Sequence, residues 1–154
     1  MLKTSKPVTL LVADDNADDR VLMQEALAES QVFHQVRFVE DGEQLMDYLY
    51  RRGAYQDPER APYPSLILLD LNMPRKDGRE ALREIKADPR LCVIPVVVLT
   101  TSKAETDISS TYSLGVNSFI TKPATFDALL ELLQTLGHYW FETVELPSPS
   151  GEYL

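Results

Sequence analysis

The stretch Ser65-Leu66-Ile67-Leu68-Leu69-Asp70-Leu71-Asn72-Met73-Pro74 decides the fold, because it is an apolar run that delivers one carboxylate just before a turn. Residues 66–69 show no polar alternation, so both faces of this segment must be covered, as in the central strand of a parallel sheet flanked by helices. In open α/β sheets, ligands and reactive groups collect beyond the carboxyl ends of the strands, so Asp70 is expected to face a crevice. A lone Asp here can also be a simple turn residue, and the other strand ends decide between the two interpretations.

Size and composition predict one globular domain. The 154 residues are 44% hydrophobic and 25% charged, which allows a sizeable core and leaves little room for a second domain. The net charge of −9, with 15 scattered basic residues, argues against nucleic-acid binding. The single Cys92 excludes an internal disulfide, and the first apolar run, 8–13, is too short for a signal peptide or a membrane span. We therefore expect a cytoplasmic protein that binds neither nucleic acid nor membranes.

Strand and helix patterns alternate along the whole chain. Besides 66–69, strands are expected at 8–13, 36–39, 94–99 and 118–121, with helices beginning near residues 17, 42, 79, 104 and 125. This alternation predicts an α/β fold with a doubly wound parallel sheet and helices on both faces. The proline-containing segment 53–64 is expected to be an insertion within the domain, and the helix at 104–113, rich in Ser, Thr and Ile, to be weakly held.

Polar side chains stand at the exits of four predicted strands: Asp14 and Asp15, Asp70, Thr100, and Lys122. The first turn lacks the glycine-rich patterns that bind phosphates, and its two carboxylates would repel a phosphate. Three carboxylates and one ammonium at a common edge suit Mg²⁺. With that cation and Lys122 neutralising charge, Asp70 could take a phosphoryl group as an acyl phosphate, and Thr100 could donate a hydrogen bond to it.

These residues, together with Asp70-Leu71-Asn72-Met73-Pro74, Asp77-Gly78 and Lys122-Pro123, resemble the signature of bacterial response-regulator receiver domains over about residues 9–136. The resemblance implies a flavodoxin-like, CheY-like sheet of five strands in the order 2-1-3-4-5. It also implies that Asp70 is phosphorylated by a partner histidine kinase, and that the Lys122–Pro123 bond is cis, which only X-Pro bonds adopt at low cost.

The resemblance further implies how the site works. Asp15, Asp70 and the backbone carbonyl of Asn72 would bind Mg²⁺, and Asp14 would assist through water. Such domains catalyse their own phosphorylation and slow dephosphorylation. They then signal through a Thr that swings toward the phosphoryl group and an aromatic that fills its place, which here are Thr100 and Phe119. Receiver domains more often have Tyr at the position of Phe119, and the missing hydroxyl could alter how readily the Phe119 ring turns inward.

A narrower resemblance, carried by the long loop before Asp70 and the segment 139–144, is to the single-domain regulators of cyanobacterial phytochrome kinases. It implies a red-light-regulated kinase as donor and a homodimer through the last strand, last helix and tail. We accordingly expect a receiver domain at 7–137, a contact tail at 138–154 with Tyr139, Trp140 and Phe141 as interface candidates, and no output domain, so that an unknown downstream protein receives the signal. The same aromatics could instead fold back over their own domain.

Two other classes of function remain open. A Mg²⁺-dependent phosphohydrolase of the aspartyl-phosphate type would need a second acid two residues after its nucleophile, where Asn72 stands. An interaction module that is never phosphorylated is disfavoured by the intact Asp15, Asp70 and Lys122. Taken singly, the strand-end residues could be helix caps or solvated charges, and Phe119 could be a core residue.

Overall fold

The computed structural model describes residues 8–33, 35–101 and 104–147, and its centre is a parallel sheet of five strands in the order β2-β1-β3-β4-β5. The strands are β1 (Thr9–Ala13), β2 (Gln35–Val39), β3 (Leu66–Leu69), β4 (Val96–Thr100) and β5 (Ser118–Thr121). The helices that follow them are α1 (Ala17–Ser30), α2 (Gly42–Tyr50), α3 (Gly78–Ala87), α4 (Glu105–Leu114) and α5 (Phe126–Gly137). The predicted fold class and strand order are therefore confirmed.

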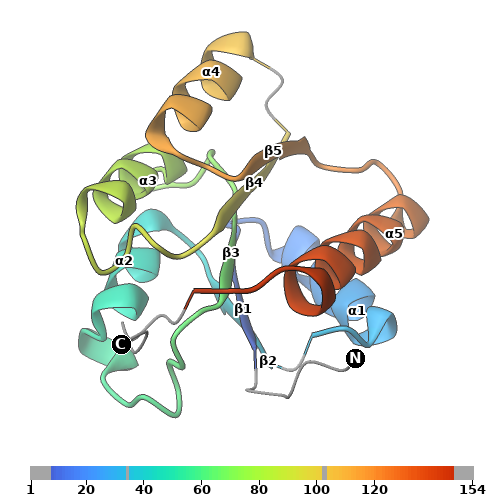
Figure 1. The fold of residues 1–154 in the computed structure, drawn as a ribbon, viewed down its shortest axis with the longest axis horizontal. Helices are drawn as coiled ribbons and strands as arrows, with labels where there is room; N and C mark the ends of the chain where they lie inside the picture. Colours follow the sequence, from blue (N-terminus) through green and yellow to red (C-terminus); the bar gives the residue numbers. More distant parts are fainter. Residues whose placement is uncertain (1–7, 34, 102–103, 148–154) are drawn as a thin grey trace.

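The apolar run that precedes Asp70 forms the central strand, β3, between β1 and β4. All four of its residues are buried, and they alternate between two core clusters: Ile67 and Leu69 belong to one, Leu66 and Leu68 to the other. Helices α2, α3 and α4 lie on one side of the sheet, and α1 and α5 lie on the other (Figure 1). The run needs no polar alternation because each face of β3 meets a layer of helices.

Helices α1, α2 and α3 each begin at a side-chain cap. Asn16 accepts a hydrogen bond from the backbone N–H of Asp19 at 2.9 Å, and Asp41 and Asp77 cap α2 and α3 in the same way. Helix α4 follows Ala104, which supplies no side-chain cap, and Thr111 is the one residue that is buried along α4. Helix α4 therefore starts without a side-chain cap and buries little of its surface, and its weak attachment stays a prediction.

The segment between α2 and β3 packs on the domain. It contains a 3-10 turn, η1 (Gly53–Tyr55), and the ring of Tyr55 lies 5.3 Å from that of Tyr48. The hydroxyl of the buried Tyr48 donates a hydrogen bond of 2.6 Å to the carbonyl of Pro62. These contacts tie the segment to α2, as expected of an insertion within one domain.

After α5 the chain continues as a π-helical turn, η2 (His138–Thr143). Trp140 and Phe141 are partly buried against the α1–α5 side of the core, and Phe141 meets Phe33 edge to face with centroids 5.0 Å apart. Tyr139 keeps 52% of its surface exposed. Two of the three aromatic interface candidates thus pack on their own domain. The boundary between 7–137 and 138–154 stays a prediction, and residues 7 and 148–154 of it lie outside the described residues.

Within the described ranges, no helix combines the length and the apolar character that crossing a bilayer requires.

Candidate functional site

The sheet's hydrogen-bond ladder continues past the strand ends and aligns the site residues at one edge. The backbone N–H of Asp14 donates to Val39 at 3.0 Å, that of Asp70 to Ala13 at 3.0 Å, and that of Lys122 to Thr100 at 2.8 Å. Because parallel strands share a carboxyl edge, this register brings together residues that are distant in the sequence.

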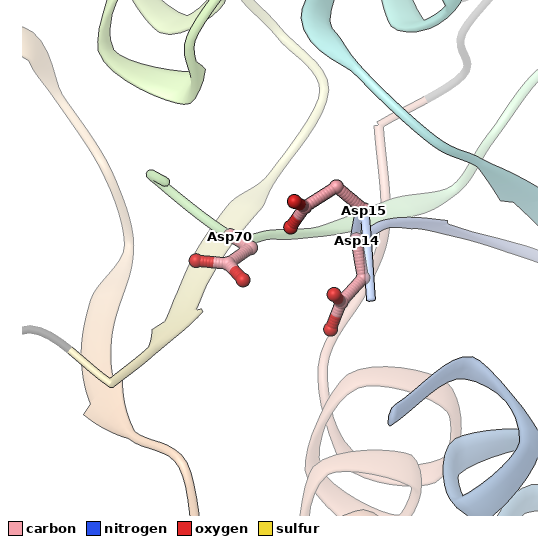
Figure 2. A group of neighbouring side chains, drawn as sticks. All are labelled: Asp14, Asp15 and Asp70. Carbon is pink, nitrogen blue, oxygen red and sulfur yellow. The ribbon is translucent and has the colours of Figure 1, made fainter. Parts of the chain in front are cut away.

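Three carboxylates meet at this edge. Asp14 and Asp15 follow β1, Asp70 follows β3, and their side chains lie together (Figure 2), with one oxygen of each within 4.8 Å of the others. Asp14 and Asp70 are 3% and 6% exposed, whereas Asp15 is exposed to solvent. The predicted grouping of acids is therefore present, with one open side.

Lys122 holds this cluster together. Its Nζ donates to Asp14 at 2.7 Å, to Asp70 at 2.9 Å and to Asp19 at 3.0 Å. Burial lowers the pKa of Lys122, but the hydrogen bonds to these three carboxylates outweigh it and leave that pKa above its ordinary value. Burial raises the pKa of Asp14 and outweighs the opposing hydrogen bond from Lys122. Buried negative charge is thus compensated only in part.

Asp70 is held on both of its oxygens. The hydroxyl of Thr100, which is 0% exposed, donates to Oδ1 at 2.8 Å, and the backbone N–H of Asn72 donates to the same atom at 3.2 Å. Lys122 donates to Oδ2. The structure therefore brings together Asp14, Asp15, Asp70, Thr100 and Lys122, as the strand-exit argument predicts.

Phe119, the predicted aromatic partner of Thr100, is partly buried against the α2–α3 side of the core. Its backbone N–H donates to the hydroxyl of Tyr112 on α4 at 3.2 Å. Phe119 is thus a residue of β5 whose backbone is hydrogen-bonded to α4, and its rotation in a switch stays a prediction.

The predicted cis bond between Lys122 and Pro123 is wrong, because this bond is trans in the structure. The trans preference of an X-Pro bond is only about 0.5–1 kcal/mol, so tertiary contacts select the isomer and the dipeptide sequence does not. Lys122 reaches its carboxylate partners with the trans bond.

Asp19 is a site residue that the strand-exit argument missed, because it lies in the first turn of α1 and not at the end of a strand. Its carboxylate is 41% exposed and accepts from Lys122. The signal was available: Asp19 lies in the first turn of α1, and the N-terminus of that helix follows directly on Asp14 and Asp15.

The donor set fits a hard divalent cation. Within the described part of the chain, the Lys122 ammonium pairs with the carboxylates of Asp14, Asp19 and Asp70, and Asp15 adds a fourth carboxylate beside Asp14 and Asp70. The atoms that could bind a metal are all carboxylate oxygens, and oxygen ligands favour Mg²⁺, Ca²⁺ or Mn²⁺ over softer ions. Asp14, Asp15 and Asp70 are the residues close enough to share one ion, and the backbone carbonyl of Asn72 as a further ligand stays a prediction.

Comparisons with known proteins agree with this geometry. Residues 10–134 match the family of response regulator receiver domains. The response regulator Rcp1 of Synechocystis sp. is 48% identical over 141 residues, which cover 92% of this chain and 93% of that protein. The phosphorylated cyanobacterial phytochrome response regulator RcpA superposes with a TM-score of 0.84 at 48% identity, covering 93% of this chain and 100% of the other. The Mn²⁺-bound form of Rcp1 superposes with a TM-score of 0.82 at 44% identity, covering 92% and 100%.

Proposed function

Because the chain belongs to the response regulator receiver domain family, we propose that it is a phosphorylation-dependent switch of two-component signalling in which Asp70 accepts a phosphoryl group from a sensor histidine kinase. The observation that carries this proposal is that Asp70 sits between two donors, Thr100 at 2.8 Å from Oδ1 and Lys122 at 2.9 Å from Oδ2. The same hydroxyl and ammonium are suited to neutralise a phosphoryl group attached to that carboxylate.

In the proposed reaction, a carboxylate oxygen of Asp70 attacks the phosphorus of a phosphohistidine and forms an acyl phosphate. The P–N bond breaks, and its electron pair leaves with the histidine nitrogen. Lys122 and Thr100 transfer their hydrogen bonds from the free carboxylate to the phosphoryl oxygens. Asp15, Asp70 and the Asn72 carbonyl would hold Mg²⁺, with Asp14 acting through water. When bound, Mg²⁺ supplies neutralisation of the negative charge on the phosphoryl oxygens.

The same residues would let the chain catalyse its own phosphorylation and its slow reversal, in which water attacks phosphorus and inorganic phosphate leaves Asp70. Asn72 supports a slow reversal, because an amide cannot act as the general base that a phosphohydrolase places two residues after its nucleophile. The Asn72 side-chain oxygen instead accepts from Arg79 at 3.4 Å. This chemistry favours a switch over turnover of phosphate esters.

The switch would run from Thr100 to Phe119. When the Thr100 hydroxyl turns to the phosphoryl group it leaves Asp70 Oδ1, and Phe119 moves into the vacated space. Because the backbone of Phe119 is bonded to Tyr112, this movement would alter the surface formed by α4 and β5.

We assign the kinase to the phytochrome type, because a regulator named for a cyanobacterial phytochrome is 48% identical to this chain. A homodimer through β5, α5 and the tail is the second part of this proposal, supported by the exposed Tyr139 on η2. The lone Cys92, which allows no internal disulfide, supports the proposal that the protein works in the reducing cytoplasm. The receiver domain at 7–137 and contact tail at 138–154 would then pass the signal to a separate protein.

Incubation with acetyl phosphate and Mg²⁺, followed by intact-protein mass spectrometry, tests the phosphoacceptor. The wild type and Asp18→Asn, a change to an exposed acid outside the cluster, should gain one phosphoryl group, and Asp70→Asn should gain none. Equal labelling of Asp70→Asn would assign the phosphoryl group to another residue. An unlabelled wild type would favour the interaction module, and turnover of a generic phosphomonoester would favour the phosphohydrolase.

Phosphotransfer from phytochrome kinases and from kinases of other sensor classes tests the partner. The phytochrome kinases should transfer fastest, and transfer at equal rates from all of them would remove the support for that pairing. Sedimentation with and without beryllofluoride tests the dimer, which should become more stable when Asp70 carries this phosphoryl mimic.

A further inference from the structure

The β3–α3 loop, residues 70–77, carries both Asp70 and Asn72, and it is bound to the start of α2. Arg75 Nη1 donates to Asp41 Oδ2 at 2.7 Å, and the backbone N–H of Gly42 donates to the carbonyl of Lys76 at 2.8 Å. Two adjacent residues of the loop are therefore joined to two adjacent residues of α2's first turn.

Asp41 is a buried carboxylate whose side chain is 2% exposed. Its Oδ1 accepts from the backbone N–H of Gln44 at 2.8 Å and so caps α2, and its Oδ2 accepts from Arg75. A buried charge is costly unless it is paired and hydrogen-bonded, so Arg75 is the counterion that Asp41 requires. The Arg75 side chain is 64% exposed, so its guanidinium pairs with the buried acid from the surface.

The loop backbone is also constrained. Arg75 has a φ of 64°, in the left-handed region that side chains other than Gly seldom adopt, and surrounding contacts must hold such a conformation. A Cβ at Gly42 would collide with the Lys76 carbonyl, and a Cβ at Gly78 would collide with the Asp70 carbonyl. The loop therefore packs directly against the start of α2, and its end at Gly78 packs against its first residue, Asp70.

We propose that Asp41 and Arg75 form a clamp that positions the β3–α3 loop, and with it Asn72 and Asp70, for binding of the divalent cation. Arg75 and Asp41 are positioning residues and touch neither the cation nor the phosphoryl group. The inference rests on the proposed function, since the cation serves phosphorylation of Asp70. Partners that orient metal ligands typically change metal affinity by about 10–100-fold when they are removed.

The test compares Arg75→Ala, Arg75→Lys and Asp41→Asn with the wild type, and Arg52→Ala serves as the matched control. Arg52 is an exposed arginine just after α2 that pairs with Asp47 of that helix, outside the β3–α3 loop. Three quantities are measured on each protein: Mg²⁺ affinity by calorimetry, amide exchange of residues 71–77 without metal, and the rate of labelling by acetyl phosphate at saturating Mg²⁺.

Arg75→Ala should weaken Mg²⁺ binding about tenfold and speed amide exchange in 71–77, and Arg75→Lys, which keeps a cation near Asp41, should restore most of both. Asp41→Asn keeps a cap for Gln44, and adding Arg75→Ala to it should cause little further loss because the clamp is already broken. Arg52→Ala should match the wild type.

Unchanged Mg²⁺ affinity and loop exchange in Arg75→Ala would overturn the clamp. So would a loss that Arg75→Lys fails to restore, or additive losses in the double variant. If the wild type binds Mg²⁺ but is never phosphorylated, the proposed function fails and the clamp is judged on Mg²⁺ affinity alone. If the wild type binds no Mg²⁺, both fail.

Discussion

Replacing Lys122 by Met removes the ammonium from the acidic cluster while keeping a long unbranched side chain. Lys122 is 14% exposed, and its Nζ lies 2.7 to 3.0 Å from the oxygens of Asp14, Asp70 and Asp19. At an effective dielectric constant of about 20, each contact has a gross Coulomb energy of about 5–6 kcal/mol, which desolvation of the ions largely offsets. Removing one partner of a buried ion pair costs about 3–5 kcal/mol, and we expect that loss in the free energy of unfolding without divalent ions.

Saturating Mg²⁺ should shrink the loss in Lys122→Met, because the cation neutralises the same carboxylates. Without a competing ammonium the variant should bind Mg²⁺ about tenfold more tightly. That factor corresponds to about 1.4 kcal/mol of recovered stability at Mg²⁺ concentrations far above both dissociation constants. Urea unfolding in EDTA and in excess Mg²⁺ measures the loss, and calorimetric titration measures the affinity.

Lys76→Met is the control for this experiment, because Lys76 pairs with Glu84 at a half-buried site outside the acidic cluster. Lys76→Met should lower the free energy of unfolding by no more than about 1 kcal/mol, and the loss should be the same with and without Mg²⁺. If Lys122→Met loses equal stability in EDTA and in Mg²⁺, or binds Mg²⁺ more weakly than the wild type, then the ammonium and the metal do not compensate the same charge and the reasoning is refuted.

Two further predictions concern the α2–β3 insertion and α4. Burial raises the pKa of Tyr48 to about 12, so the stability that its neutral form supports is present below pH 10 and lost between pH 10 and 12, by about 3 kcal/mol in all. Tyr48→Phe should cost about 1 kcal/mol at pH 8 by removing the hydrogen bond to Pro62. Because the wild type loses about 2 kcal/mol by pH 11.5, urea unfolding should then show the variant to be the more stable protein by about 1 kcal/mol, and a constant difference would contradict this. Arg79 of α3 donates two hydrogen bonds of 2.7 Å to the carboxylate of Asp107 on α4, so Arg79→Ala should speed amide exchange in α4 about fivefold. Arg83→Ala, which removes an exposed arginine of α3, should leave that exchange unchanged. Equal exchange in both variants would mean that α4 is held elsewhere.

The sequence by itself determined the sheet and most of the site. Burial of β3 on both faces is indicated by Leu66 to Leu69, because an apolar run without polar alternation, within a series of alternating strands and helices, fits a strand covered by helices on both faces. Once the strands are parallel, their carboxyl ends share one edge, so the meeting of Asp14, Asp70 and Lys122 follows from the order of elements.

Only the tertiary structure decided contacts that depend on small energies or on side chains from distant elements. Asp19 joins Lys122 across 103 positions of sequence, a contact that depends on how α1 packs beside the end of β5. The trans preference of the Lys122–Pro123 bond is only about 0.5–1 kcal/mol, so the isomer depends on tertiary contacts that the dipeptide sequence does not show. Phe141 packs on Phe33, where its aromatic pattern fitted an intermolecular contact equally well. A local pattern shows that a side chain must be buried, and the packed fold determines which surface buries it.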